Sequence, residues 1–112
     1  MVKLTIRVKT RPGKKKEFLI SCLGHRSSQG LIDHLRKEKG CLKYNFQKDK
    51  DRKDEFIIES EWNSMGEFEA HFKSKYYSFL IGAIHILCEQ KTAKIVNGNR
   101  IKEIDLIKKI QK

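Results

Sequence analysis

The residues with the clearest potential for chemistry lie in the stretch EWNSMGEFEAHFKSKYYSFL, residues 61–80, which contains the only tryptophan of the chain. It predicts a strand that ends at Trp62, a polar turn, and a short helix that carries His71, an arrangement typical of a pocket wall. His71 could act as a general base or as a hydrogen-bond donor to a phenolic oxygen, because histidine titrates near neutral pH. The structural alternatives are a histidine hydrogen-bonded to the backbone at a helix end and a tryptophan that seals the core.

Further aromatic residues could complete a pocket for a flat ligand, although core packing accounts for them equally well. They are Tyr44, Phe46, Tyr76, Tyr77 and Phe79. The sequence contains no glycine-rich phosphate loop and no HExxH, GxSxG or paired-carboxylate motif. The aromatic residues and His71 are therefore the main candidates for a functional site.

The composition is that of a soluble globular domain. The chain has 112 residues, of which 38% are hydrophobic and 35% charged, enough for one domain with a single core. No apolar run approaches the ~20 residues of a membrane helix, and the first residues predict a strand rather than a signal peptide, so we expect a cytoplasmic protein. Three distant cysteines without a CxxC pair favour reduced, buried thiols and argue against a metal site.

The net charge of +11 raises nucleic acid or an acidic ligand as a partner. The positive residues are dispersed, at 14–16, 48–53 and 108–109, rather than gathered into one stripe. Such runs are usually solvated faces, so we do not expect nucleic acid as the main partner.

Hydrophobic periodicity predicts alternating strands and helices. Residues 2–9 alternate strictly and predict a strand with one buried face. Helical spacing follows over residues 14–39, with an expected break at GHRSSQG, residues 24–30. Strands are predicted for CLKYNFQ, EFIIESEW and TAKIV, with helical segments between the last two. The order β-α-β-β-α-β is that of an α+β, ferredoxin-like split βαβ fold with a four-stranded antiparallel sheet.

Three local expectations accompany this order. Alternation in CLKYNFQ places Leu42 on the same face as Tyr44 and Phe46. Ser64 and a glutamate three residues later predict a capping box at the start of a helix. The helix at about residues 75–89 is apolar on most faces, so we expect it to be well buried.

Residues 98–112 follow a predicted domain of residues 1–97. Isoleucines recur every three positions between lysines, at Ile101, Ile104, Ile107 and Ile110. This spacing predicts a short amphipathic helix docked on the body of the protein or on a partner subunit. A solvated tail is the alternative.

Three motifs together resemble the antibiotic biosynthesis monooxygenase (ABM) family over about residues 1–97. They are RPGKKKEF after the first strand, EKGCLKYNF at the second, and EFIIESEWNSMGEFEAHFKS through the third strand and its helix. The resemblance implies a homodimer in which two four-stranded sheets form one dimeric α+β barrel with the helices outside. Many members oxidise quinol-like aromatic substrates with O₂ and without a metal or flavin, and others degrade haem.

The resemblance to the haem-degrading members is incomplete. That branch uses an asparagine on the first strand, a tryptophan on the helix after the third strand, and a histidine about ten residues later. Aligned on the EW step, these positions hold Ile6, His71 and Ile81. All three depart from the pattern, so we do not expect haem degradation. His85, one helical turn beyond Ile81, could still contact a ligand.

Three hypotheses of function follow. The first is a cofactor-independent monooxygenase for a small aromatic or quinol-type substrate, with His71 as the base and Arg7 as a nearby cation that stabilises the substrate anion. The second is a non-catalytic ligand-binding or regulatory homodimer of the same fold, and the third is a basic nucleic-acid-binding protein. The expected substrate-binding residues are Trp62, Tyr44, Phe46, Tyr76, Phe79 and His85.

Overall fold

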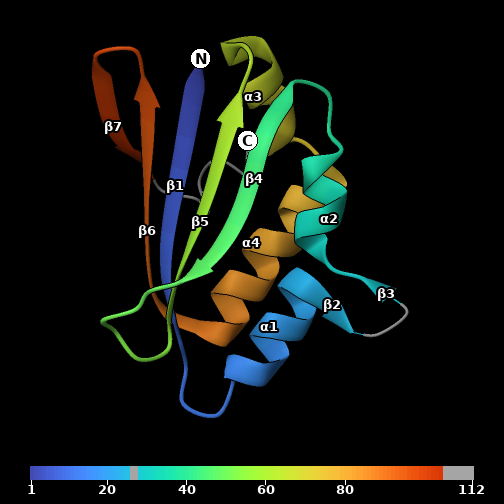
Figure 1. Ribbon diagram of the computed structural model, residues 1–112, viewed down its shortest axis with the longest axis vertical. Helices are drawn as coiled ribbons and strands as arrows, with labels where there is room; N and C mark the ends of the chain where they lie inside the picture. Colours follow the sequence, from blue (N-terminus) through green and yellow to red (C-terminus); the bar gives the residue numbers. More distant parts are fainter. Residues whose placement is uncertain (26–27, 105–112) are drawn as a thin grey trace.

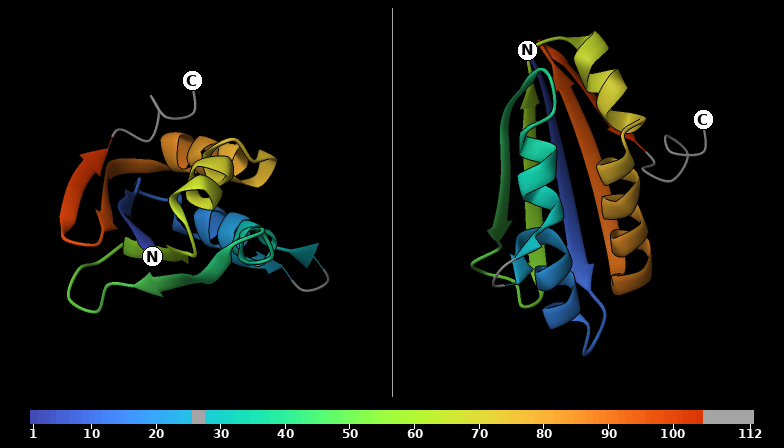
Figure 2. Two further views of the ribbon diagram at one scale, coloured as in Figure 1. Left: turned by 90° about the horizontal axis from the view of Figure 1, so that it is seen from above. Right: turned by 90° about the vertical axis from the view of Figure 1, so that its right-hand side faces the viewer.

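Five antiparallel strands form one sheet, and the helices cover one of its faces (Figure 1, Figure 2). The computed structural model describes residues 1–25 and 28–104. The strands lie in the order β4-β5-β1-β6-β7. Their bounds are β1 (Val2–Thr10), β4 (Cys41–Lys48), β5 (Glu55–Trp62), β6 (Cys88–Asn97) and β7 (Arg100–Ile104). The helices are α1 (Lys15–Leu23), α2 (Leu31–Arg36), α3 (Met65–Phe72) and α4 (Lys75–Leu87).

β1 is the central strand because it pairs with β5 on one side and with β6 on the other. Its alternating sequence buries one set of side chains beneath the helices and turns the other set to the opposite face, which we call the open face. The buried set is Val2, Leu4, Ile6, Val8 and Thr10. The prediction of an α+β, ferredoxin-like fold is confirmed, with β7 as an additional edge strand.

The helical stretch after β1 is interrupted, as the glycines and serines of residues 24–30 predict. A small ribbon of β2 (Gly24–His25) and β3 (Ser28–Gln29) separates α1 from α2. A Cβ atom at Gly30 would overlap with backbone atoms of Cys22 and Gly24, so this close approach of two segments requires glycine.

The start of α3 follows the predicted cap. The Oγ atom of Ser64 accepts a hydrogen bond from the backbone N–H of Glu67 at 3.2 Å and donates one to the Glu67 carboxylate at 3.1 Å. The glutamate thus binds the serine hydroxyl, whereas in the usual capping box it binds the backbone N–H of the cap residue. The cap fixes where α3 begins and so determines which of its residues point at the sheet.

Two predictions of burial are confirmed only in part. α4 packs on the sheet with only one side, so Phe79 and Ile86 on its outer side are 54% and 68% exposed. In β4 the register shifts between Cys41 and Lys43, which leaves Leu42 exposed although Tyr44 is buried. A single layer of helices and one bulge account for both differences.

The predicted C-terminal helix was also wrong over its first residues. Arg100–Ile104 form β7, which pairs with β6 from Asn97↔Arg100 to Ala93↔Ile104. The turn between the strands contains Gly98 at φ +61°, a conformation that favours glycine and suits a tight hairpin. The sheet of the first domain therefore continues through Ile104, and residues 105–112 lie outside the described part of the chain.

None of the described helices is long and apolar enough to span a membrane.

Candidate functional site

His71 lies in the interior, where α3 and α4 meet β4 and β5. Its imidazole is only 2% exposed and stacks on the indole of Trp62, with ring centroids 4.4 Å apart and an interplanar angle of 28°. The ring of Tyr77 meets it edge-on at 4.5 Å and that of Tyr44 at 5.6 Å. We call these four residues, together with Glu38, the His71 cluster. It unites three of the predicted site residues, His71, Trp62 and Tyr44.

Both ring nitrogens of His71 have partners. Nδ1 lies 2.9 Å from Oε1 of Glu38, and Nε2 lies 3.4 Å from the hydroxyl oxygen of Tyr44. A carboxylate only accepts hydrogen bonds, so we assign the proton to Nδ1, which leaves Nε2 as the acceptor. Burial lowers the pKa of His71 and outweighs the opposing effect of Glu38, while burial raises the pKa of Tyr44. The cluster is therefore a neutral imidazole, held by a carboxylate, next to a protonated phenol.

Two further polar groups lie in this part of the core. The indole N–H of Trp62 donates to Oγ of Ser60 at 3.0 Å. The buried hydroxyl of Tyr77 has no hydrogen-bond partner among residues 1–25 and 28–104. A buried hydroxyl without a partner is unusual in a packed core and marks this region as one whose polar groups are not all used for stability.

A groove of about 290 Å³ opens next to the cluster, between α3 and the hairpin of β6 and β7. The helix side is formed by residues with helical spacing that face one way, Met65, Phe68, Glu69 and Phe72. The strand side is formed by Ile95 and Asn97 of β6 and by Arg100 and Lys102 of β7. We call this feature the α3 groove. It combines an apolar surface with a basic edge.

Ring contacts connect the α3 groove to the His71 cluster. Phe68 contacts Trp62 with ring centroids 6.4 Å apart, and Phe72 contacts Tyr77 at 5.1 Å and His71 at 6.0 Å. His71 itself is not among the residues that line the groove. The two phenylalanines are thus a single layer of side chains that touches both the groove and the buried imidazole.

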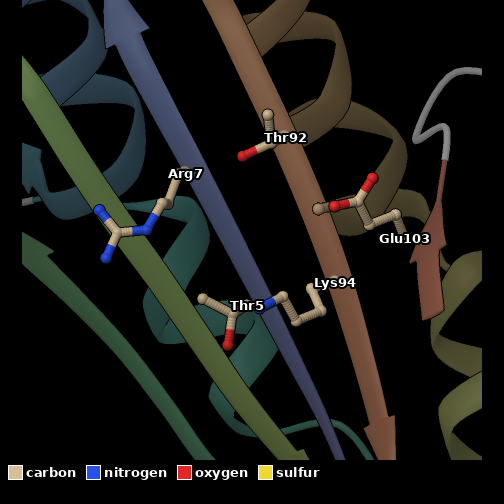
Figure 3. A pocket seen from close by; sticks show the side chains of 6 residues that line it. Thr5, Arg7, Thr92, Lys94 and Glu103 are labelled. Atoms are coloured by element: carbon tan, nitrogen blue, oxygen red, sulfur yellow. The ribbon is translucent and has the colours of Figure 1, made fainter. Parts of the chain in front are cut away.

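Arg7 lies on the open face, with the sheet between it and His71. A hollow of about 350 Å³ is lined there by Thr5, Arg7, Thr92, Ala93, Lys94 and Glu103. Figure 3 shows the labelled side chains among them extending from β1, β6 and β7. The Arg7 guanidinium makes an ion pair with Asp49 at 3.2 Å. The prediction that Arg7 is the cation near His71 is wrong. Adjacent residues of a strand point to opposite faces, and in β1 Ile6 points inward, so Arg7 points to the open face.

A family model and a curated protein match the sequence of this chain. The model of the family described as antibiotic biosynthesis monooxygenase matches residues 1–79. The chain belongs to the ABM family. It is 30% identical over 70 residues to the uncharacterized protein sll1783 of Synechocystis, a match that covers 62% of this chain and 44% of that protein. The chain thus matches less than half of the length of this curated relative.

Two solved structures share the architecture. A crystal structure of an antibiotic biosynthesis monooxygenase superposes with a TM-score of 0.72 at 19% identity, over 89% of this chain and 100% of that one. A conserved protein from Methanosarcina mazei superposes with a TM-score of 0.73 at 20% identity, over 86% and 90% of the two chains. At these identities the likeness shows the fold alone.

The other residues predicted for the site lie apart from His71. Phe46 packs against Phe18 and Phe56, with ring centroids 5.9 and 5.3 Å away. Tyr76 stacks on His34 at 4.2 Å, which places it on the side of α2. The structure divides the predicted aromatic wall into separate clusters.

Two predicted site residues lie on the outer side of α4. Phe79 is exposed and meets the ring of Tyr76 edge-on at 6.2 Å. His85 is exposed too, and its Nδ1 lies 3.4 Å from Nζ of Lys91. Neither residue lines the α3 groove.

Sequence analysis missed several residues of the site. Glu38 is 33 positions from His71 in the chain, and no local sequence pattern predicts that the two side chains pair. The isoleucine spacing predicts a helix that includes Arg100 and Lys102, although Gly-Asn at 98–99 is one of the two-residue pairs that indicate a hairpin turn. The spacing of Met65, Phe68, Glu69 and Phe72 was a further available signal, since it places all four on one helical face.

Among residues 1–25 and 28–104 no group of three or more His, Cys, Asp or Glu side chains is arranged to hold a metal ion.

Proposed function

We propose that this ABM-family protein is a monooxygenase that oxidises a small aromatic or quinol-type substrate with O₂. The observation that carries the proposal is the hydrogen bond between the buried His71 and the partly buried Glu38, beneath the phenylalanine layer of the α3 groove. A neutral imidazole with a fixed tautomer is suited to removing a proton from a substrate, and a carboxylate behind it stabilises the imidazolium that forms.

The chemistry assigned to the protein is deprotonation and protection from water. In the proposed reaction His71 takes a proton from the substrate, and the resulting carbanion, delocalised over the ring, transfers electrons to O₂ and forms a C–O bond. One oxygen atom becomes a carbonyl oxygen on the oxidised carbon. The other leaves as water with the hydrogen of this ring carbon and the hydrogen of the phenolic hydroxyl, so a phenolic ring and O₂ give a quinone and H₂O.

Access to His71 is the step that the phenylalanine layer controls in this proposal. Phe72 is 8% exposed and in ring contact with His71, so its displacement would let a substrate ring stack within the cluster. At 3.4 Å the hydrogen bond from Tyr44 to Nε2 is long, which makes Nε2 available to a better donor. The hydroxyl of Tyr77, without a described partner, is a second group that a substrate oxygen could engage.

Oxygen uptake with a panel of quinols and hydroxylated naphthalenes tests the proposal. We expect His71→Gln to lower turnover by about 10²-fold or more, the usual scale for a general base, with a circular dichroism spectrum like that of the wild type. His85→Gln is the matched control, because His85 is exposed on α4, and it should retain full turnover. Equal turnover of the two variants would remove His71 from the mechanism.

A second function, ligand binding without turnover, is favoured by one observation: His71 is covered by protein and is not in the lining of the groove. If panel compounds bind to the α3 groove but the wild type consumes no O₂ with any of them, the chain is a non-catalytic ligand-binding or regulatory protein. Binding and O₂ uptake measured on the same samples separate the two functions.

We also propose that the protein is a homodimer that pairs through the open face. On that face β1 carries the basic residues Lys3 and Lys9, while β5 carries Glu55, Glu59 and Glu61. A two-fold axis between the strands would set a basic row over an acidic row of the other subunit. Sedimentation equilibrium should give twice the 13.2 kDa protomer mass. A protomer mass at every concentration would contradict this arrangement.

A further inference from the structure

We infer that the α3 groove binds an aromatic carboxylic acid and that Arg100 and Lys102 of β7 bind its carboxylate. The inference rests on the proposed function only in taking this acid as the substrate; the binding site itself does not depend on turnover. It assigns a role to the hairpin of β6 and β7, whose last strand lies at the edge of the sheet.

The strand side of the α3 groove brings the two cations together. In a strand, residues two apart point to the same face and lie about 7 Å apart along the chain. Arg100 and Lys102 have this spacing, and their partners in the register, Asn97 and Ile95, line the groove with them. Both cationic side chains are long enough to reach one oxyanion, and the guanidinium can bind a carboxylate through two parallel hydrogen bonds.

The charges of these two residues are not neutralised by the described part of the chain. Arg100 and Lys102 make no ion pair within residues 1–25 and 28–104, whereas on the open face Lys3 pairs with Glu59 at 3.0 Å and Lys43 with Glu61 at 3.8 Å. Two cations beside an apolar surface attract a ligand that combines an anion with a hydrophobic body.

The helix side of the α3 groove specifies the rest of the ligand. Met65, Phe68 and Phe72, with Ile95 opposite, provide an apolar surface on which an aromatic ring can pack. Glu69 is the acidic residue of this lining, and it disfavours an anion on the helix side. Glu69 can accept a hydrogen bond from a ligand hydroxyl. The carboxylate is therefore directed to β7 and a hydroxyl to α3.

The volume of the α3 groove limits the size of the acid. At about 290 Å³ it is at the small end of ligand sites, which usually span roughly 300–1,000 Å³. One or two fused rings with a carboxylate fit this space, whereas a dinucleotide or a haem does not. The ligand class is a hydroxylated benzoic or naphthoic acid.

A comparison of two nearly isosteric probes tests the charge recognition. The full-length chain is titrated with 2-naphthoate and with 2-naphthamide, which has the same rings and no charge, while amide chemical shifts are followed by NMR. We expect the acid to bind at least 10-fold more tightly than the amide and to shift resonances of α3 and β7. Arg100→Gln and Lys102→Gln should each weaken acid binding by about 5- to 10-fold and leave amide binding unchanged.

The matched control is Lys16→Gln, which removes the same charge from an exposed position on α1. It should change acid binding by less than 2-fold, because exposed charges at a distance are screened by salt. A variant of the apolar helix side, Met65→Gln, should weaken binding of both probes equally. Each variant is first compared with the wild type by its amide spectrum, since Met65, Arg100 and Lys102 are all on the surface.

Two results would overturn the inference: equal affinity of the wild type for acid and amide, or equal effects of the Arg100, Lys102 and Lys16 substitutions on acid binding. The outcome is independent of the proposed oxidation. Charge-dependent binding of the acid without O₂ uptake refutes the proposed function and leaves the binding site standing. O₂ uptake with neutral quinols, together with equal affinity for the acid and the amide, supports the proposed function and refutes the carboxylate-binding site.

Discussion

The two faces of the sheet differ in the number, burial and pairing of their polar residues. On the helix-covered face the buried polar residues are few. In the His71 cluster, contacts run from the partly buried Glu38 to the buried His71 and Tyr44. On the open face cations and carboxylates pair across neighbouring strands, as in Lys3–Glu59 and Lys43–Glu61. One face holds a small set of groups in fixed geometry, and the other balances many charges in contact with solvent.

This difference shows where chemistry and where association are to be expected. Exposed ion pairs stabilise little and suit a surface that meets a partner of complementary charge. A buried imidazole with a carboxylate partner has an altered pKa and a fixed tautomer, both of which a catalyst needs. The α3 groove differs from both faces, because its cations have no described counter-ion.

The largest expected effect is a loss of stability when the buried indole of Trp62 is removed. Trp62→Ala removes a fully buried indole that contacts His71, Tyr44 and Phe68, and we expect a loss of about 3–5 kcal/mol in the free energy of unfolding. Lys43→Ala on the open face should change it by no more than about 0.5 kcal/mol. Urea denaturation measures both. Similar losses in the two variants would contradict the assignment of the core to the helix-covered face.

A smaller effect is expected from the two carboxylates that pair on opposite faces. Glu38→Ala leaves the Nδ1–H of His71 without an acceptor in the interior and should cost about 2 kcal/mol, because an unsatisfied buried donor keeps its desolvation penalty. Glu59→Ala breaks the exposed pair with Lys3 and should cost about 0.5 kcal/mol. If Glu59→Ala proves as costly as Glu38→Ala, the contrast between the faces is not one of burial.

The pH dependence of stability sharpens the same contrast. Burial lowers the pKa of His71 in the folded state below its ordinary value of 6.5, so the unfolded chain binds the proton more readily. The stability that His71 contributes is therefore complete above pH 6.5 and is lost as the pH falls from there through the folded pKa. Thermal unfolding between pH 7.5 and 5 should show a smaller loss of stability for His71→Gln than for the wild type. His85→Gln, on the solvent side of α4, should follow the wild-type curve.

The smallest expected effect is the change in absorbance when haem is added to the protein. Ile6 and Ile81 are buried apolar side chains, and His85 is exposed on the outer side of α4, away from the His71 cluster. Titration with haemin should therefore give no tight Soret complex, and His85→Ala should leave the weak absorbance changes unaltered. A stoichiometric complex that His85→Ala abolishes would show that a site for haem exists on α4.

Much of the fold could be predicted because its signals are local. The strict alternation of β1, the break at residues 24–30 and the serine cap of α3 each depend on a few neighbouring residues. The errors arose where a tertiary arrangement overrode such a signal. α4 is apolar on most sides but is covered on one only. The isoleucine spacing at 101 and 104 fits a helix, although the Gly-Asn turn at 98–99 returns the chain as β7.

The site was predictable in part for a related reason. His71 and Trp62 were identified by residue type and by a short separation in sequence, and the fold does bring them into contact. Only its charge indicates Arg7 as the cation near His71, and the pleat of β1 directs its side chain to the open face instead. No sequence pattern linked Glu38 to His71, since their pairing joins the end of the α2 segment to α3.

The sequence by itself determined the strands β1, β4, β5 and β6 and the helical segments between them. It also determined which side of β1 is apolar and that a short capped turn separates Trp62 from the helix of His71, because these properties depend on alternation, helical spacing and local hydrogen bonds. Only the tertiary structure decided that Glu38 lies against His71, that Arg7 is separated from it by the sheet, and that Arg100 and Lys102 border an apolar groove on α3. These facts are set by packing between segments far apart in the chain, where register and helix orientation, rather than residue type, decide which side chains meet.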